Sequence, residues 1–291
     1  KIADCEAVRP DIAGIMGAFG AALAARDLHL ERSALLSEQA LASFTHTARP
    51  VTCNLCTNHC SLTINTFDGG RRFVSGNRCS RPLGEEPSHL PDLMRYKYGK
   101  LRALHGKGQG DGSRGKIGIP FGLNMYENLP FWFELFTRLN FEVVLSPESS
   151  RKLYLKGQRT IPSDTVCYPA KLLHGHVEAL VEAGVDAIFY PCMPYNFNEG
   201  VSDNNYNCPV VAYYPELLAA NVPNLKKVRY LNPYFGLHRP KDFERKASEW
   251  FFTEFQVPKR ETVAAAKAAY AAYDAYKEDL RATGRAYIEQ A

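Results

Sequence analysis

The sequence lacks several features that would place it in a large functional class. Its 291 residues carry 35 basic and 31 acidic side chains, and this near balance is not that of a nucleic-acid-binding surface. No apolar run approaches the roughly 20 residues of a membrane-spanning helix. The start, KIADCEAVRP, has neither the apolar core nor the small-residue cleavage site of a signal peptide. We therefore expect a cytoplasmic protein that binds neither nucleic acid nor membrane.

Two further absences concern the ends and the loops of the chain. The sequence does not begin with methionine, and we interpret it as a piece cut from a longer chain. The glycine-rich stretch at 106–115 is not a phosphate-binding loop, because no Gly-Lys-Ser/Thr follows it and no strand precedes it. Since this stretch has no apolar anchor, it predicts a flexible linker.

From residue 116 onward the sequence predicts an α/β fold. The predicted strands are 116–120, 141–146, 186–191, 209–215 and 227–233. The predicted helices are 128–140, 147–157, 169–184, 241–256 and 259–289, and a further helix is predicted at 11–42. Apolar strands separated by helices are typical of an open, mainly parallel sheet with helices on both faces.

Four of the eight cysteines form a first group near the N-terminus, Cys53, Cys56, Cys60 and Cys79. Two β-prone segments, 61–67 and 71–76, flank the turn signal at 68–70 and predict a hairpin. Pairing them would return Cys79 to the side of Cys60. The sequence thus predicts a small Cys-rich hairpin with a four-thiolate metal site.

The nature of this first site stays open at the level of the sequence. Four cysteines suit structural zinc or an iron–sulfur cluster, and zinc is favoured because the hairpin resembles an arm of a zinc ribbon. His59 could replace one cysteine, and four reduced thiols without metal are the plain alternative. A closed four-ligand site has no open position, so we expect it to stabilise the hairpin rather than to catalyse.

A second group, Cys167, Cys192 and Cys208, is dispersed in the sequence. Cys167 immediately precedes a predicted helix, whose N-terminus favours a thiolate. Cys192 directly follows a predicted strand, and in an open parallel sheet such loops build the binding crevice. Cys208 precedes a predicted strand, which would place it at the opposite edge unless the loop 193–207 folds it back. The plain alternative is three small apolar residues in the core. His174 and His176 are interpreted as ordinary helix histidines, one of them near the crevice.

Several unusual stretches resemble one family: IGIPFGLNMYENLPFWFELFTRLNFEVVLSPESSRKLYLKG, then CYPAKLLHGHVEAL and IFYPCMP. They are similar to the uncharacterised domain of large CoA-substrate-specific enzyme activases, which are relatives of the 2-hydroxyacyl-CoA dehydratase system. The resemblance covers roughly residues 50–260. The stretch MGAFGAALAAR also resembles the last helix of an actin-like ATPase domain. The family has arginine after the Ile-Pro of the first strand, where this chain has Phe121, so a role such as anion binding is in doubt here.

The resemblance implies a domain order and a set of cofactors. It suggests the tail of an upstream ATPase domain at 1–45, the Cys-rich hairpin at 46–105, a linker at 106–114, a dehydratase-subunit-like domain at 115–258 and a C-terminal helix at 259–291. The related dehydratase subunits bind a [4Fe–4S] cluster through cysteines of α/β domains. By resemblance, Cys167 and Cys192 match its ligands. Cys208 or a residue of a second α/β domain beyond 291 would complete the site.

Three functional interpretations follow from the sequence. The first is an iron–sulfur electron-transfer or reductase-type domain that works with an ATP-driven activator. The second is a zinc-stabilised docking domain without chemistry of its own. The third is a nucleotide- or acyl-CoA-binding module in the crevice of the sheet, for which Tyr126, Tyr168 and Lys171 are the only indications. Substrate, reaction and oligomeric state do not follow from the sequence.

Overall fold

The computed structural model describes residues 8–29, 35–56, 58–85, 90–106, 110–200 and 202–290. The chain divides into two compact units: residues 1–51 with 61–77, and residues 52–60 with 78–291. Each unit is described by itself. Cys5 lies outside the described residues, as do 30–34 of the predicted first helix and 107–109 of the predicted linker.

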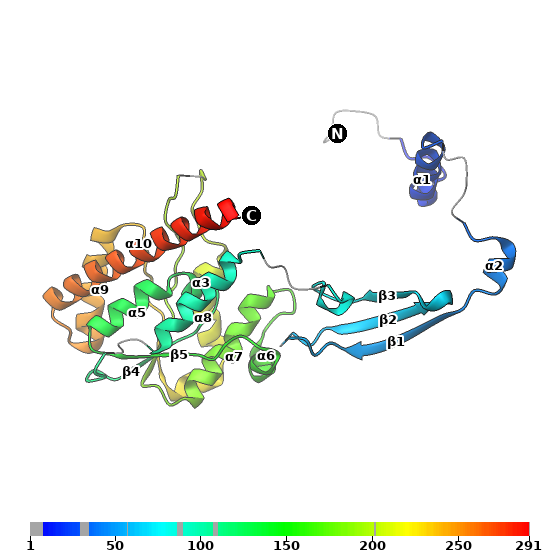
Figure 1. The fold of residues 1–291 in the computed structure, drawn as a ribbon. Helices are drawn as coiled ribbons and strands as arrows, with labels where there is room; N and C mark the ends of the chain where they lie inside the picture. The colour runs from blue at the N-terminus through cyan, green and yellow to red at the C-terminus, as the bar shows by residue number, and fades with distance from the viewer. Residues whose placement is uncertain are drawn as a thin grey trace. The chain divides into compact units, whose positions relative to one another are not determined.

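The first unit contains two helices and a three-stranded sheet (Figure 1). Its helical elements are η1 (Ala13–Ile15), α1 (Met16–Asp27) and α2 (Glu38–Ala42). Its strands are β1 (His46–Thr52), β2 (Ser61–Phe67) and β3 (Arg72–Ser75), in the order β1-β2-β3. The prediction of one continuous helix over 11–42 is wrong, because α1 ends at Asp27 and His29 adopts a φ of 47°. The prediction also missed β1.

The predicted hairpin is confirmed. Strands β2 and β3 pair antiparallel, with Thr63 opposite Ser75, around the turn η2 (Asp68–Gly70). Gly76 ends the return strand with a φ of 82°, and a Cβ at this position would collide with the carbonyl oxygen of Ser61. Only glycine combines this backbone conformation with so close an approach.

The second unit is an α/β domain that is preceded by a short helical region. That region contains η3 (Arg81–Leu83), α3 (Leu93–Arg102) and η4 (Ala103–Gly106). The strands are β4 (Lys116–Ile119), β5 (Glu142–Leu145), β6 (Ala187–Phe189) and β7 (Arg229–Leu231). The helical elements are α4 (Leu123–Glu127), α5 (Leu129–Arg138), α6 (Arg151–Gly157), η5 (Gln158–Thr160), α7 (Tyr168–Glu182), α8 (Pro209–Asn221), η6 (Pro223–Lys227), α9 (Pro240–Phe255) and α10 (Lys259–Gln290).

The four strands form a parallel sheet in the order β5-β4-β6-β7. From β4 the chain passes through α5 to the edge strand β5, and it then crosses back over β4 to β6 and β7. Because such crossovers are right-handed, α5 lies on one face of the sheet and α6 to α8 lie on the other. The open parallel sheet is therefore confirmed. The fifth strand predicted at 209–215 is wrong, because these residues begin helix α8.

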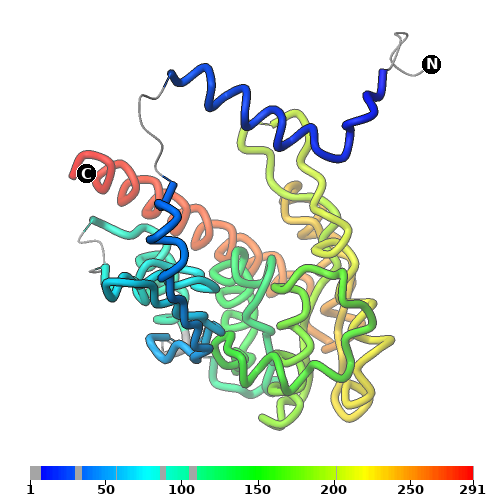
Figure 2. The backbone as a smooth tube through the Cα atoms, turned by 90° about the vertical axis from the view of Figure 1, so that its right-hand side faces the viewer, coloured from blue at the N-terminus to red at the C-terminus, as the bar shows by residue number. Residues whose placement is uncertain are grey.

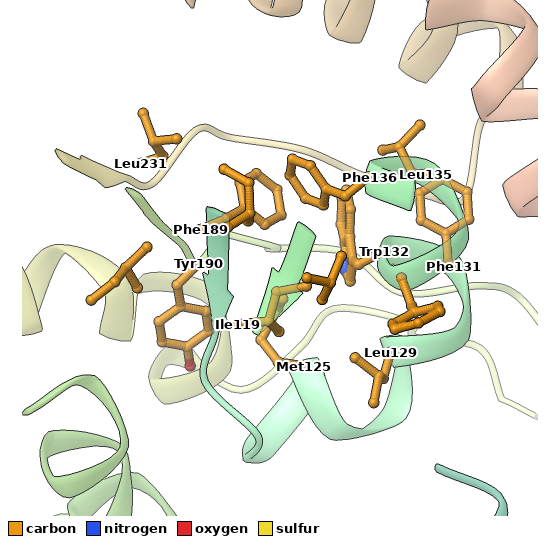
Figure 3. Packing of buried hydrophobic residues seen from close by; sticks show 14 of the residues in the cluster. Ile119, Met125, Leu129, Phe131, Trp132, Leu135, Phe136, Phe189, Tyr190 and Leu231 are labelled. Carbon is orange, nitrogen blue, oxygen red and sulfur yellow. The ribbon is translucent and has the colours of Figure 1, made fainter. Parts of the chain in front are cut away.

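Large aromatic and aliphatic side chains fill the space between the sheet and α5, α9 and α10 (Figure 3). Trp132 of α5 is fully buried, and its ring lies 4.9 Å from that of Phe189 on β6. Phe136, one turn further along α5, contacts the same Phe189 ring at 4.8 Å. This apolar face holds α5 against the sheet and fixes the strand ends around which the loops fold.

Helix α10 is the longest element, with 32 residues, and packs along α5 and α9 (Figure 2). Small residues allow the close packing: Ala265, Ala266 and Ala269 are buried against the core. Within the described residues no helix combines the length and the apolar character that a bilayer crossing requires. Just after the end of α5, the Asn140 carbonyl accepts a hydrogen bond from the Arg114 amide at 3.2 Å. The end of the predicted linker is therefore attached to the α/β domain.

Candidate functional site

The carboxyl edge of the parallel sheet collects the candidate residues. Cys192 follows β6, and its amide donates to the Pro233 carbonyl at 2.9 Å, while its own carbonyl accepts from the Phe235 amide at 3.1 Å. Cys192 thereby forms a parallel bridge with Tyr234, which extends the β6–β7 ladder beyond the strands. The position of this cysteine at the sheet edge is thus set by backbone pairing, as the sequence predicted.

The thiol of Cys192 is buried and lies beside helix α8. Burial raises the pKa of this thiol to about 11, and the Glu216 carboxylate acts in the same direction. The Glu216 backbone and the nearby Tyr234 hydroxyl oppose this rise. In the structure the single hydroxyl proton of Tyr234 is donated to the Glu216 carboxylate. In this structure, then, Cys192 is a protonated thiol next to groups that can donate to sulfur.

The other two cysteines of the second group are helix N-caps. Cys167 caps α7 and Cys208 caps α8, with nearly identical backbone angles (φ −60°, ψ 148° and 152°). The Cys208 sulfur accepts from the Val211 amide at 3.4 Å. Both residues are exposed. Because α8 replaces the expected strand and follows β6, Cys208 stands at a helix N-terminus and not at the start of a strand.

Two buried tyrosines connect the three cysteines. Burial raises the pKa of Tyr190 well above its usual value, with smaller contributions from Tyr230, Cys192, Tyr214 and Cys208. Burial also raises the pKa of Tyr214 to about 12, and Cys167 adds to this. Each thiol therefore lies within electrostatic reach of one of these two phenols, although only Cys192 follows a strand.

Among the described residues, the Tyr190 hydroxyl has no hydrogen-bond partner. It is fully buried, and the described residues offer it no hydrogen bond. Figure 3 shows its ring turned away from the aromatic cluster around Phe189 and Trp132. A buried hydroxyl without a partner costs free energy, so Tyr190 is a candidate hydrogen-bond donor to a bound group.

Tyr214, by contrast, belongs to a hydrogen-bonded chain. The Thr160 hydroxyl donates to the Gly157 carbonyl at 2.9 Å, so it can only accept from Nδ1 of His174 at 2.7 Å. Nε2 of His174 is then unprotonated and accepts from the Tyr214 hydroxyl at 3.0 Å. Burial lowers the pKa of His174 to about 4, which keeps this chain neutral.

His176 starts a second chain on the opposite side of α7. The Phe121 amide donates to Ser146 Oγ at 2.8 Å, and Ser146 Oγ lies 2.7 Å from Nδ1 of His176. Nε2 of the ring lies 3.0 Å from Ser149 Oγ. Burial lowers the pKa of His176 to about 4 as well.

A pocket of 240 Å³ opens beside this chain, at the carboxyl ends of β4 and β5; it is called the β4–β5 pocket below. Its lining residues are Tyr98, Phe121, Gly122, Leu123, Tyr126, Ser149, Pro169, Leu172 and His176. Phe121 occupies the place where the resemblance expects arginine, and it is buried. Of the other residues indicated by the sequence, Tyr126 lines this pocket, Tyr168 is exposed, and Lys171 donates to the Asp164 carbonyl at 2.6 Å.

Two glycines place α7 within reach of these partners. A Cβ on Gly175 would collide with the Leu153 carbonyl of α6, and a Cβ on Gly157 would collide with the backbone of Gly175. The backbones of α6 and α7 therefore touch where they cross. This close approach lets Thr160, just beyond α6, reach His174.

In the first cysteine group, Cys53, Cys56 and Cys60 lie in the turn between β1 and β2, and Cys79 follows β3. The Cys53 amide donates to the Cys60 carbonyl at 2.8 Å and closes the loop between them. Cys53 is buried, whereas Cys56 and Cys79 are exposed. His59 has a φ of 44°, and its ring pairs with Asn54 at 3.2 Å.

The structure does not assemble the predicted metal sites. Across the parts of the chain that it describes, no three histidine, cysteine, aspartate or glutamate side chains are arranged to hold a metal ion. This applies to both cysteine groups, so their ligand roles remain predictions. The structure does bring together the carboxyl edge of the sheet, the N-termini of α7 and α8, and the side chains of Tyr190 and Tyr214.

Sequence reasoning gave His174 and His176 no place in a hydrogen-bonded chain, although it placed one of them near the crevice, and it missed Tyr190 and Tyr214. The signal was available for the histidines, since they are two imidazoles in a mainly apolar helix that packs on a sheet. A buried histidine needs a partner for each nitrogen. Tyr190 and Tyr214 lie inside two predicted strands, 186–191 and 209–215, and the sequence pattern gives them no role of their own.

The α/β unit matches a known protein family. Residues 116–291 match the family model described as CoA enzyme activase uncharacterised domain (DUF2229). The match begins at β4 and includes α10, whereas the resemblance was expected over roughly 50–260. No curated protein and no solved structure matches the chain. Since the family model covers more than half of the sequence, the chain belongs to the CoA enzyme activase uncharacterised domain family.

Proposed function

We propose that this domain binds an iron–sulfur cluster through Cys167, Cys192 and Cys208 and serves electron transfer in a CoA enzyme activase system. The observation that carries the proposal is the placement of Cys192 and Cys208 near the Tyr190 hydroxyl, which is buried and has no partner among the described residues, with Cys167 near the neighbouring Tyr214. Two of the thiols cap helices whose N-terminal dipoles favour negative charge. When bound, the cluster would supply one-electron redox chemistry.

The chemistry of the available donors fits such a group. Thiolates are the ligands that iron–sulfur clusters prefer, and the exposed Cys167 and Cys208 are accessible to an incoming cluster. Burial keeps Cys192 protonated in the free protein, so its thiolate would form on metal binding, with release of a proton. The Tyr190 hydroxyl would then donate to sulfur, which is how proteins commonly tune such a group.

The proposal includes partners that lie outside this sequence. An actin-like ATPase domain upstream would use ATP to drive electron transfer to the cluster, and a second α/β domain beyond residue 291 would supply the remaining cluster ligand. The exposed Cys167 and Cys208 are consistent with a site that a second domain completes.

For the first cysteine group we propose structural zinc, bound by Cys53, Cys56, Cys60 and Cys79. The hydrogen bond from the Cys53 amide to the Cys60 carbonyl supports this, because it closes the loop that carries three of the ligands. The β2–β3 register supports it too, since it continues toward Cys60 on one strand and Cys79 on the other. Metal binding would stabilise a hairpin whose own apolar core is small.

The two sites can be separated by experiment. The 291-residue chain is produced and purified without oxygen, and its iron, sulfide and zinc contents are measured together with its electron paramagnetic resonance after reduction. Cys167→Ser and Cys208→Ser are expected to abolish iron and sulfide and to retain zinc. Cys56→Ser, an equally exposed cysteine of the first group, is the matched control and is expected to retain iron.

Two outcomes would count against the proposal. Iron and sulfide contents that are unchanged in Cys167→Ser and Cys208→Ser would remove these residues as ligands. Protein that contains zinc but no iron under strictly anaerobic conditions would favour a zinc-stabilised docking domain instead.

A further inference from the structure

The β4–β5 pocket is a second candidate site, and neither the family match nor the cysteines account for it. It opens at the carboxyl ends of two parallel strands, where open α/β sheets bind their ligands. One wall is formed by α7, through Pro169, Leu172 and His176, which are spaced along one face of the helix. All its walls come from the α/β unit.

Three aromatic rings form the opposite wall. The Phe121 ring lies 5.0 Å from that of Tyr126 and 5.9 Å from that of Tyr98, and the two tyrosine rings are 5.8 Å apart. Two of the three pairs are stacked, with interplanar angles of 20° and 23°. Such a wall gives the pocket an apolar, aromatic lining that suits a flat molecule.

The cations beside this wall are already paired. Lys97 lies 5.9 Å from the Tyr126 ring and forms an ion pair of 2.6 Å with Glu127. Arg102 lies 5.7 Å from the Tyr98 ring and forms an ion pair of 2.5 Å with Glu148. With the cations paired and two carboxylates close by, the pocket offers an anion little compensation for the loss of its water.

The polar end of the pocket is formed by His176 and Ser149 and carries no charge. His176 is fully buried and uncharged at neutral pH, because burial lowers its pKa to about 4. If the Phe121 amide donates to Ser146, and Ser146 donates to Nδ1 of His176, then Nε2–H donates to Ser149 Oγ. The Ser149 hydroxyl proton is then left for a ligand in the pocket. The Phe121 amide fills one acceptor position of Ser146 Oγ, and the proposal takes the tautomer of His176 in which the Ser146 hydroxyl donates to Nδ1.

We propose that the β4–β5 pocket binds a small uncharged molecule with a flat apolar face and a carbonyl oxygen. The flat face would lie against Tyr98, Phe121 and Tyr126, and the carbonyl oxygen would accept from Ser149. A carboxylate of the same shape would be rejected, because it would lose its water without meeting an unpaired cation. The proposal rests on the walls of the pocket and is independent of any cluster.

The test compares two probes of nearly equal shape, benzamide and benzoate. Binding to the 291-residue chain is measured near neutral pH by saturation-transfer difference NMR and by chemical-shift perturbation. Benzamide is expected to bind, and benzoate is expected to bind at least about tenfold more weakly, because its charge loses water without compensation. Equal or tighter binding of benzoate would overturn the proposal, as would the absence of benzamide binding.

Variants then locate the binding site. Ser149→Ala removes the donor and is expected to weaken benzamide binding about three- to tenfold, which is the range for one hydrogen bond. Tyr126→Leu removes one ring of the wall and is expected to weaken it as well. Ser163→Ala, an exposed serine away from the pocket, is the matched control and should bind like the parent chain. Unchanged affinity in both Ser149→Ala and Tyr126→Leu would exclude this pocket.

Discussion

Acidification is expected to destabilise the α/β unit through the buried histidine His176. The pKa of this imidazole is about 4 in the folded chain and 6.5 in the unfolded one, so the unfolded chain binds more protons between these values. The contribution of His176 to stability is complete above pH 6.5 and is lost as the pH falls toward 4. At about pH 5 the loss is about 2 kcal/mol, since one unit of pKa shift corresponds to about 1.4 kcal/mol. His174 acts in the same direction, because burial lowers its pKa as well.

The measurement is urea unfolding near pH 7.5 and near pH 5, followed by tryptophan fluorescence. The chain has two tryptophans, Trp132 of α5 and Trp250 of α9, so the signal reports on the α/β unit alone. In His176→Gln the free energy of unfolding should fall by about 2 kcal/mol less between the two pH values than in the parent chain. His174 and all carboxylates are common to both proteins and cancel in this difference. An equal fall in both proteins would refute the reasoning.

Three further substitutions test other parts of the structure. Gly175→Ala places a methyl group against a carbonyl of α6 and should lower the free energy of unfolding by about 1–3 kcal/mol or more. Its control, Gly99→Ala in α3, meets no neighbouring atom and should leave the free energy of unfolding unchanged or raise it by up to about 1 kcal/mol in the same urea assay. Gly76→Ala should disrupt the end of the β2–β3 hairpin, visible as faster amide hydrogen exchange there; unaltered exchange would contradict the expected collision with the Ser61 carbonyl of β2. Tyr190→Phe removes a buried hydroxyl that has no partner among the described residues and should raise the stability of the metal-free chain by about 1–2 kcal/mol; a loss of stability would mean that the hydroxyl has a partner.

Much of the α/β fold could be predicted from the sequence because its strands are short and apolar throughout. The segment 209–215 shows where this approach fails. PVVAYYP is rich in β-branched and aromatic residues, and a short apolar run of this kind does not distinguish a buried strand from a buried helix. Pro209 occupies the first turn of α8, where proline is well tolerated, and Pro215 lies within the helix. The β propensity of this segment is outweighed by the packing of α8 on the sheet.

The candidate site was predictable only in part, for a related reason. The position of Cys192 after a strand and that of Cys167 before a helix are local features, and the sequence predicted both. The networks of His174 and His176 join segments that are far apart in the chain, such as Thr160 with Tyr214 and Ser146 with α7. No local pattern carries that information.

The contact between the backbones of α6 and α7 has a mechanical consequence. Helix α7 carries Cys167 at its N-cap and lines the β4–β5 pocket with its following turns, and its backbone touches that of α6 at the glycine crossing. A ligand that tilts α7 must therefore also displace the Cys167 sulfur at the N-terminus of this helix. The rate at which an alkylating reagent labels Cys167 would then report, at a distance, whether the pocket is filled.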